Sequence, residues 1–156
     1  MYFLSIISVI IATGIICLTS MGVGGNYIVW RIFDVPTIIM FLLLFIPLLA
    51  SSGLWKDFNN AFRIGIGKKK TENLLELKRA GEAVGLSIKI TGAAAMFIVA
   101  IQFIQILYNL EAPYLLGPSF VVLTLAVLYG MGLIMILLPL KSILNVKIQE
   151  YISGQE

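Results

Sequence analysis

The stretch NLEAPYLLGPSFVVLTLAVLYG, residues 109–130, decides the fold. It opens with a short polar turn and continues as an apolar run that ends in Tyr129 and Gly130. A polar turn in front of a long apolar run predicts the turn and the second arm of a helical hairpin in a membrane. Any such hairpin needs only a turn and apolar residues, so the groups NL, P, LGP and LYG need a more specific explanation.

The whole chain has the composition of an integral membrane protein. Of its 156 residues, 60% are hydrophobic and 12% are charged, whereas a soluble domain keeps about 25% charged residues. A helix needs about 20 apolar residues to cross the bilayer, and four segments are close to this length or above it: 1–18, 35–54, 86–108 and 114–140. We therefore predict an all-α fold in which residues 1–156 form a single membrane domain with four transmembrane helices. A signal peptide is the alternative for residues 1–18, but the segment lacks a basic start and a clean cleavage site.

Basic residues predict the orientation of these helices. The loop 55–83 between the second and third spans carries seven of them, the first outer loop has only Arg31, and the loop between the third and fourth spans has none. Because basic residues favour the cytoplasmic side of a membrane, we expect both termini and the loop 55–83 in the cytoplasm. A nucleic-acid site is poorly supported, because the lysine run 68–70 is short and no aromatic residues alternate with it.

Residue types that carry chemistry are scarce. The chain has no histidine and one cysteine, Cys17, so we expect no disulfide within one chain and no metal site. No motif of a nucleotide-binding or hydrolytic site occurs in a usable context. All 8 carboxylates lie outside the predicted spans. We therefore expect neither enzyme activity nor a cofactor.

The loops contain signals of helix starts. Asp34 stands two residues before Pro36, which predicts a helix with an aspartate cap and a proline in its first turn. The segment WKDFNNAF, residues 55–62, has aromatic residues at helical spacing. This pattern indicates either an aromatic belt at a charged exit from the membrane, which is the favoured interpretation, or a helix that runs along the membrane interface. The segment GIGKKKTE, residues 65–72, should break this helix. Thr71 is then expected to cap a new helix that runs on into the third span.

Four stretches resemble the MotA/TolQ/ExbB proton-channel family, and flagellar stator subunits of the MotA kind in particular. GGNYIVWRIFDVPTII at 24–39 is similar to the family's approach to its second span, and RAGEAVG at 79–85 to the approach to its third. The opening stretch at 109–130 resembles the family's NL-x-x-P, LGP and LYG hairpin without gaps. LLPLKSIL at 137–144 resembles the proline-bearing end of the family's fourth span. Four spans match the MotA arrangement, whereas TolQ and ExbB have three.

The resemblance implies a homo-oligomer, a pentamer in this family, in the inner membrane of a bacterium. The third and fourth spans would line a central channel that holds two single-span partners of the MotB/TolR/ExbD kind. The partner would supply the aspartate that carries the proton or sodium ion, and ion flow would turn one ring against the other. The lack of carboxylates in the predicted spans fits this division, because an ionisable group in the membrane usually marks an ion path.

Two features depart from the family. The large cytoplasmic domain of the flagellar members is reduced here to the basic loop 55–83, which argues against torque on a flagellar rotor. When the hairpin is aligned with the family without gaps, the positions at which the family has polar residues beside the ion can be read off. In this chain they are occupied by Ile98–Val99 and Ala126–Val127. The expected polar relay is therefore missing or displaced.

Displaced polar residues are present on both spans. On the third span, polar residues on one helical face form a stripe that begins at Thr91 and ends at Asn109. The fourth span contains Thr124. The candidate pore-lining or ion-pathway residues are Thr91, Gln102, Gln105 and Thr124. The glutamines can equally bond between neighbouring helices. Lys89 is expected at the cytoplasmic interface, with a pore role as the alternative. Pro139 is a candidate hinge, because a proline opens the backbone hydrogen bonding of a helix.

Two functions follow from these observations. The first is the channel-forming subunit of an ion-driven motor, which surrounds single-span partner helices. The alternative is a non-conducting oligomeric membrane scaffold that holds a partner helix. The missing threonines favour the scaffold, whereas the retained hairpin and Pro139 favour the motor. A neighbouring gene for a single-span protein with an aspartate early in its span would separate the two.

Overall fold

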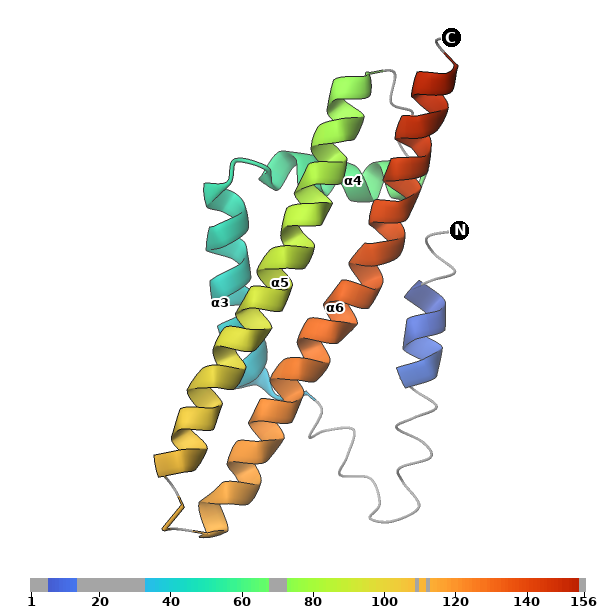
Figure 1. Cartoon of the computed structure of the whole chain (residues 1–156). Coiled ribbons are helices and arrows are strands. Elements are labelled where there is room, and N and C mark those ends of the chain that lie inside the picture. Colours follow the sequence, from blue (N-terminus) through green and yellow to red (C-terminus); the bar gives the residue numbers. More distant parts are fainter. Residues whose placement is uncertain (1–5, 14–32, 68–72, 109, 112, 155–156) are drawn as a thin grey trace.

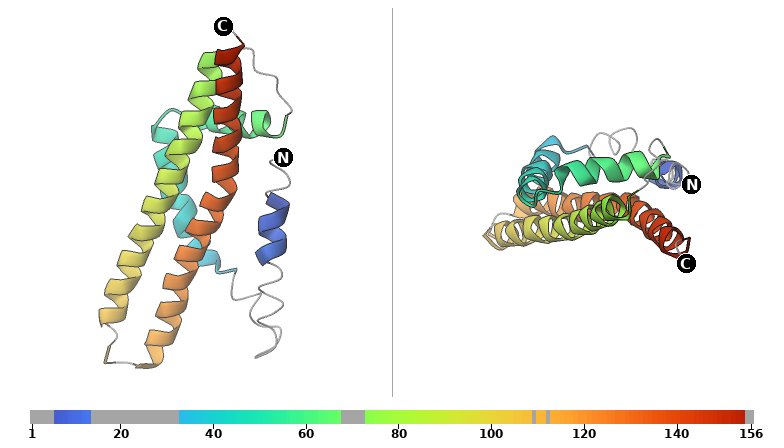
Figure 2. Two further views of the ribbon diagram at one scale, coloured as in Figure 1. Left: turned by 45° about the vertical axis from the view of Figure 1, so that its right-hand side comes forward. Right: turned by 90° about the horizontal axis from the view of Figure 1, so that it is seen from above.

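The computed structural model describes residues 6–13, 33–67, 73–108, 110–111 and 113–154. These residues form helices joined by short turns, and none of them lies in a strand, as the predicted all-α fold requires. Besides the helical residues 6–13, the elements are α3 (Val35–Ser51), α4 (Trp55–Gly65), α5 (Leu74–Tyr108) and α6 (Pro113–Ser153). Figure 1 shows α5 and α6 as the two long arms of a hairpin, and Figure 2 places α3 and α4 in a second layer on one face of these arms.

Two of the described helices, α5 and α6, are long and apolar enough to cross a membrane. The pair α3 and α4 would make a third span, although a bend of 103° separates its two helices. Alone, α3 has 17 residues and is about 25 Å long, which is shorter than the roughly 30 Å of a bilayer core. The predicted first span, 1–18, lies largely outside the described residues. The described residues thus support a membrane protein with two or three spans, and the number of four stays a prediction.

α3 begins where the sequence predicts. Asp34 is its N-cap, and the carboxylate accepts a hydrogen bond from the backbone N–H of Thr37 at 3.1 Å. Pro36 fits the first turn, where a backbone N–H has no helical partner. After Ser51 the chain turns at Gly53, whose φ of 72° is a left-handed conformation that favours glycine. This turn produces the bend into α4.

α4 is the amphipathic helix that the aromatic spacing predicts, and it packs across the hairpin (Figure 2). Its buried residues Ala61 and Ile64 belong to a core cluster with residues of α5 and α6. The ring of Phe58 meets Phe45 of α3 edge-on, with 6.0 Å between the ring centres, and this contact supports the bend. At the other end of α4, the ammonium group of Lys147 donates to the carbonyl of Ile64 at 3.1 Å. α4 is therefore attached to α3 at one end and to the arms of the hairpin at the other.

The helices extend beyond the predicted spans. Much of the predicted loop 55–83 is helical, since it contains α4 and the first turns of α5. As predicted, α5 runs unbroken from Leu74 through the third span, and α6 continues to Ser153. The lysine run 68–70 and the predicted cap Thr71 lie outside the described residues.

The two arms of the hairpin approach each other closely at Gly130. A Cβ at this position would lie 2.6 Å from the Cβ of Ala95, a separation that side chains do not tolerate. Phe41 of α3 packs over the same point and forms a second core cluster with Ala94, Ile98 and Ala126. The glycine of the LYG group in the opening stretch is therefore a contact point between the arms.

The hairpin has two different ends. At the end that we name the α4 end, α4 crosses the arms, α5 begins and α6 finishes (Figure 1). Ile6 packs against the core cluster at the same end. The turn at residues 110–111 forms the opposite end, which we name the turn end. The beginning of the described chain and the end of α6 thus lie on the side of the basic loop, and the assignment of this side to the cytoplasm stays a prediction.

Candidate functional site

Polar groups meet where the first turn of α3 contacts α6. The backbone N–H of Asp34 donates to the hydroxyl of Tyr129 at 3.0 Å. Thr37 donates to the Asp34 carboxylate from both its backbone N–H and its hydroxyl. Thr37 is 1% exposed and Asp34 is half-buried. The tyrosine of the LYG group therefore connects α3 with α6.

Asp34 lies beside the apolar first half of α6 and away from both ends of the hairpin. It borders a hollow of about 720 Å³, whose lining includes Phe33, Gly117, Pro118, Val121 and Leu125. Among the described residues that line this hollow, Asp34 is the only charged one. From the sequence, Asp34 is simply a helix cap between two spans. The sequence did not predict that Asp34 lies beside α6. This position depends on the contact with Tyr129, which is 95 positions away in the chain, and no local pattern indicates that contact.

Thr91 is the most deeply buried of the predicted site residues. Its exposed fraction is 0%, and its hydroxyl has no hydrogen-bond partner among the described residues. Ser87, one turn earlier, is equally buried, but its hydroxyl donates to the carbonyl of Ala83 at 2.8 Å. Thr91 also borders the close approach, since its carbonyl lies 3.9 Å from a Cβ placed at Gly130. A buried hydroxyl without a partner costs about 1–3 kcal/mol, so stability does not explain this residue.

Gln102 and Gln105 lie in different environments, although both belong to the predicted stripe. Gln102 is 8% exposed and faces the interior of the chain, whereas Gln105 is exposed. α3 begins only beside the middle of the hairpin, so it leaves the turn end of α5 uncovered. Neither side-chain amide has a hydrogen-bond partner within the described residues. Asn109, the last residue of the stripe, lies outside them.

Thr124 does not share a surface with the glutamines within one chain. It is exposed, and its hydroxyl donates to the carbonyl of Phe120 in its own helix at 2.9 Å. Ala126, two positions later, is fully buried in the cluster with α5. Because two residues turn a helix by about 200°, Thr124 faces away from α5. A pore lined by Thr124 and the glutamines would need more than one chain, and it stays a prediction.

Pro139 lies inside α6, which remains helical to Ser153. In the view from above in Figure 2, the last part of α6 departs from the direction of its first part. A proline inside a helix removes one backbone hydrogen bond and is a common cause of such a bend. Leu137 and Leu140 on either side of Pro139 are buried in the core cluster at the α4 end. Pro139 thus lies inside a bent helix and beside fixed packing, and movement about it stays a prediction.

The polar groups of the described residues include oxygen atoms that can contact an ion. No group of three His, Cys, Asp or Glu side chains among them could hold a metal ion. The described residues offer the Asp34 carboxylate at the start of α3, which has hydroxyl neighbours. On α5 they offer the Thr91 hydroxyl and the amides of Gln102 and Gln105, which have no hydrogen-bond partner among the described residues. Oxygen atoms of this kind can replace part of the hydration shell of an ion.

No protein-family model, no curated protein and no solved structure matches this chain.

Proposed function

We propose that this chain is the channel-forming subunit of an ion-driven motor complex of the MotA/TolQ/ExbB kind. In this proposal several copies form a closed ring, a pentamer by the resemblance, in the inner membrane of a bacterium. The ring surrounds single-span partner helices of the MotB/TolR/ExbD kind. The partner supplies the aspartate that carries the proton or sodium ion, and the chain itself catalyses no reaction.

The observation that carries the proposal is the pair of unpaired amides on α5. Gln102 and Gln105 have no hydrogen-bond partner within the described residues, yet they belong to a helix apolar enough to cross a membrane. In lipid an unsatisfied polar group costs several kcal/mol, so each amide needs water or another chain. A ring of copies around a partner helix would give each amide a neighbouring chain or pore water as its hydrogen-bond partner.

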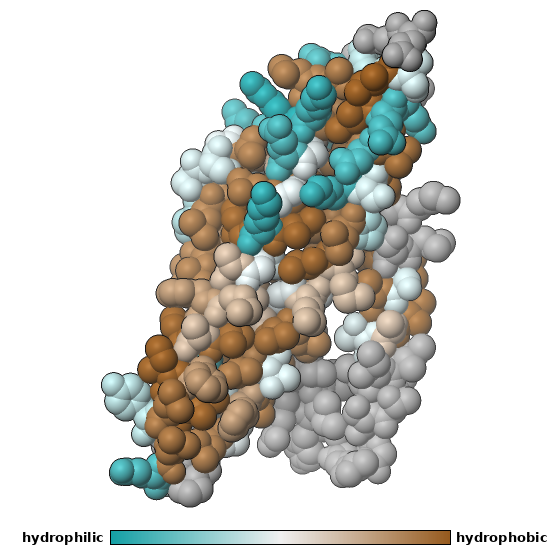
Figure 3. Space-filling model, in the orientation of Figure 1, coloured by the Kyte–Doolittle hydropathy of each residue, from teal (hydrophilic) through white to brown (hydrophobic). Residues whose placement is uncertain are grey.

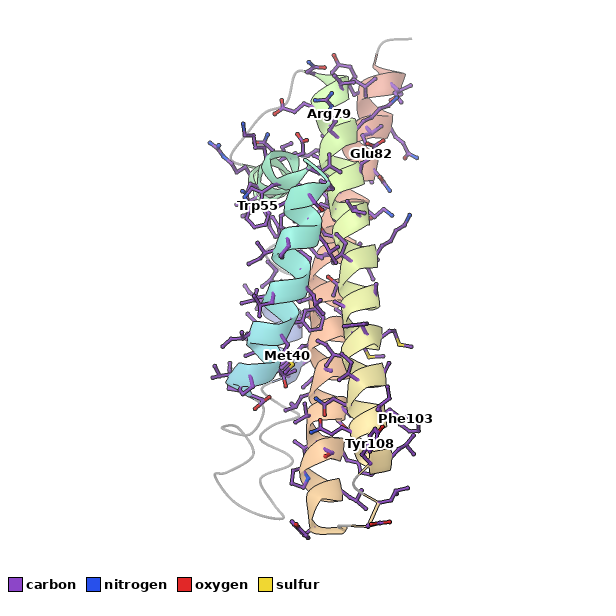
Figure 4. All side chains as sticks on the ribbon, turned by 90° about the vertical axis from the view of Figure 1, so that its left-hand side faces the viewer. Met40, Trp55, Arg79, Glu82, Phe103 and Tyr108 are labelled. Carbon is purple, nitrogen blue, oxygen red and sulfur yellow. The ribbon has the colours of Figure 1, made fainter. Side chains whose placement is uncertain are left out.

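The uncovered face of the hairpin supports the same conclusion. α3 and α4 lie on one face of the arms and leave the opposite face uncovered (Figure 2). Both arms carry large exposed apolar side chains, among them Met96, Phe103 and Met135. Figure 4 shows Phe103 on the side of α5 that points away from α3. Figure 3 shows that apolar residues cover most of this face. Such a surface suits lipid, a second copy or the single helix of a partner.

The route of the ion would differ from that implied by the family. The residues at the family's polar positions, Ile98 and Ala126, are packed with Phe41 in an apolar cluster. Thr91 and Gln102 lie on the same buried face of α5, on either side of Ile98. We therefore assign the polar contacts of the chain to Thr91 and Gln102, and the charge itself to the partner.

Ion flux in lipid vesicles tests the proposal. The vesicles hold the ring alone, or the ring with a co-expressed single-span protein whose span carries an aspartate. Flux is expected only from the combination, and replacement of the partner's aspartate by asparagine should abolish it. Flux by the ring alone would identify an autonomous channel and contradict the motor.

A non-conducting scaffold that holds a partner helix is the second candidate. The apolar cluster around Ile98 and Ala126 favours it, because this cluster stands where the family has its polar relay. The same vesicles separate the two functions. A partner that is bound, as shown by co-purification, together with no flux would support the scaffold.

A further inference from the structure

The α4 end of the hairpin carries a second polar feature, which the proposed function does not use. A shallow hollow of about 590 Å³ lies there on the arms, and Lys78, Lys89 and Lys141 line it together with Glu82 and Asn145. In Figure 3 the hydrophilic residues of this face gather at the same end. The hollow thus combines three ammonium groups, one carboxylate and one amide.

The three lysines gather without a structural partner. Within the described residues, no carboxylate lies at ion-pair distance from any of the three ammonium groups. The Lys141 side chain reaches across to α5, where its Cε and Nζ lie 3.6 Å from a Cβ placed at Gly85. Three lysines that line one hollow without an ion-pair partner give it a positive potential, which attracts an anion. The arrangement therefore indicates an anionic ligand from outside the chain.

The walls of the hollow indicate what this ligand carries besides its charge. Leu54, Leu86 and Ile148 line the hollow beside the lysines, so it is charged and apolar at once. Towards the turn end, the surface of the arms changes from hydrophilic to apolar (Figure 3). Trp55, a residue type enriched at membrane interfaces, starts α4 at this end of the hairpin (Figure 4). A ligand with an anionic head and an apolar tail fits this position.

We propose that the hollow binds the phosphate group of an anionic phospholipid. Lysine ammonium groups bind phosphate as point charges, and their flexible stems can follow an apolar helix to the headgroup level. The amide of Asn145 can donate a further hydrogen bond to a phosphate oxygen. The acyl chains would then extend from Leu86 along α5 towards the turn end. A soluble phosphate offers the same anion, but it leaves the apolar wall without a contact.

Native mass spectrometry of the full chain, released from nanodiscs with equal amounts of phosphatidylglycerol and phosphatidylcholine, tests the site. We expect the protein to retain phosphatidylglycerol. One lysine near an anionic surface changes binding about fivefold, so Lys89→Gln and Lys141→Gln should each lower the retained phosphatidylglycerol by about that factor. Lys56→Gln is the matched control, because Lys56 is an exposed lysine of α4 outside the hollow. It should leave the retained lipid unchanged.

Three outcomes would overturn the proposal. An equal loss in Lys56→Gln, or equal retention of phosphatidylcholine, would show that no specific site exists. Thermal protection by inorganic phosphate without acidic lipid, lost in Lys141→Gln, would assign the hollow to a soluble anion. A cross-link from Lys89 to an acidic segment of a co-purified protein, with no lipid retained, would assign it to a partner. Unfolding of each variant in phosphatidylcholine alone, expected to match the wild type, shows that the variants are folded.

Discussion

The hydroxyl of Tyr129 accepts a hydrogen bond from the backbone N–H of Asp34 at 3.0 Å and so joins the beginning of α3 to the hairpin. In the second half of α3, Phe45 contacts Phe58 of α4. α3 is therefore fixed at its beginning and in its second half, although it is shorter than a bilayer core. The same hydrogen bond holds its cap, Asp34, beside the apolar first half of α6. This answers part of the question raised by the LYG group, since its tyrosine positions α3 and its glycine lets the arms approach.

Replacement of Tyr129 by phenylalanine should weaken the attachment of α3. The ring stays and only the hydroxyl is lost, so we expect a decrease of about 1 kcal/mol in the free energy of unfolding, the typical worth of one hydrogen bond. Reversible unfolding in mixed micelles measures this value. Tyr114→Phe on the same helix is the control, because Tyr114 is 78% exposed. Equal effects of both substitutions would show that the bond to Asp34 contributes nothing.

Replacement of Gly130 by alanine should separate the arms. The new methyl group would lie 2.6 Å from the Cβ of Ala95, and overpacking of this kind costs about 1–3 kcal/mol. Gly132→Ala is the matched control, since a Cβ at that position meets nothing within 4 Å. In a helix this control should be neutral or slightly stabilising. Ala95→Gly should rescue Gly130→Ala, and a failure of this rescue would place the clash elsewhere.

Replacement of Thr91 by valine should have opposite effects on stability and function. Valine keeps the shape of threonine and removes the unpaired hydroxyl, so the free energy of unfolding should rise by about 1–3 kcal/mol. If the hydroxyl contacts the ion, flux through the complete complex should fall at the same time. Ser87→Ala is the contrasting variant, because it removes a hydroxyl that is already bonded to Ala83. A loss of stability in Thr91→Val would mean that the hydroxyl has a structural partner after all.

Local signals in the sequence were sufficient to predict the described helices. Asp34 and Pro36 marked the beginning of α3, because capping and a fixed proline φ act within one turn. Aromatic spacing marked α4 for a similar reason. Apolar length indicated α5 and α6 but gave their bounds poorly. Helices continue beyond the lipid where charged helix-forming residues follow, as in α6 up to Ser153.

The candidate site was less accessible to sequence reasoning. An ideal helix places Thr91, Gln102 and Gln105 on one face, but the structure buries the first two and leaves Gln105 exposed. Their burial depends on where α3 and α6 cover that face, which no local pattern encodes. The contact between Asp34 and Tyr129 is of the same kind, since it arises only when distant segments pack. The pattern thus found the polar residues of α5 but gave neither their partners nor the depth of the carboxylate.

Accessibility of single cysteines should establish the orientation. In a Cys17→Ser background, Asn59→Cys on α4 and Glu111→Cys in the turn lie on exposed positions at opposite ends of the hairpin. Because the basic residues cluster at the α4 end, we expect an impermeant thiol reagent to label position 111 in intact cells and position 59 only after lysis. Labelling of position 59 in intact cells would reverse the topology. Labelling of both positions would show that the hairpin does not cross the membrane.

The two amides of α5 provide the test of assembly. If Gln102 and Gln105 bond to neighbouring copies, then Gln102→Leu and Gln105→Leu should each weaken the ring by about 1 kcal/mol per interface, as for other interhelical hydrogen bonds in membranes. Native mass spectrometry across a detergent series measures the fraction of intact ring. Phe103→Leu, an exposed apolar position of the same helix, is the control.

The same variants distinguish the two roles of the amides. An intact ring with altered flux would place the glutamines in a pore, because a pore-lining side chain affects conduction without holding copies together. A weakened ring would give them the structural role between helices. A wild-type chain that stays monomeric in mild detergent would contradict the ring itself. The unpaired amides would then need water or a segment of the same chain, and the channel-forming function would have lost the observation on which it rests.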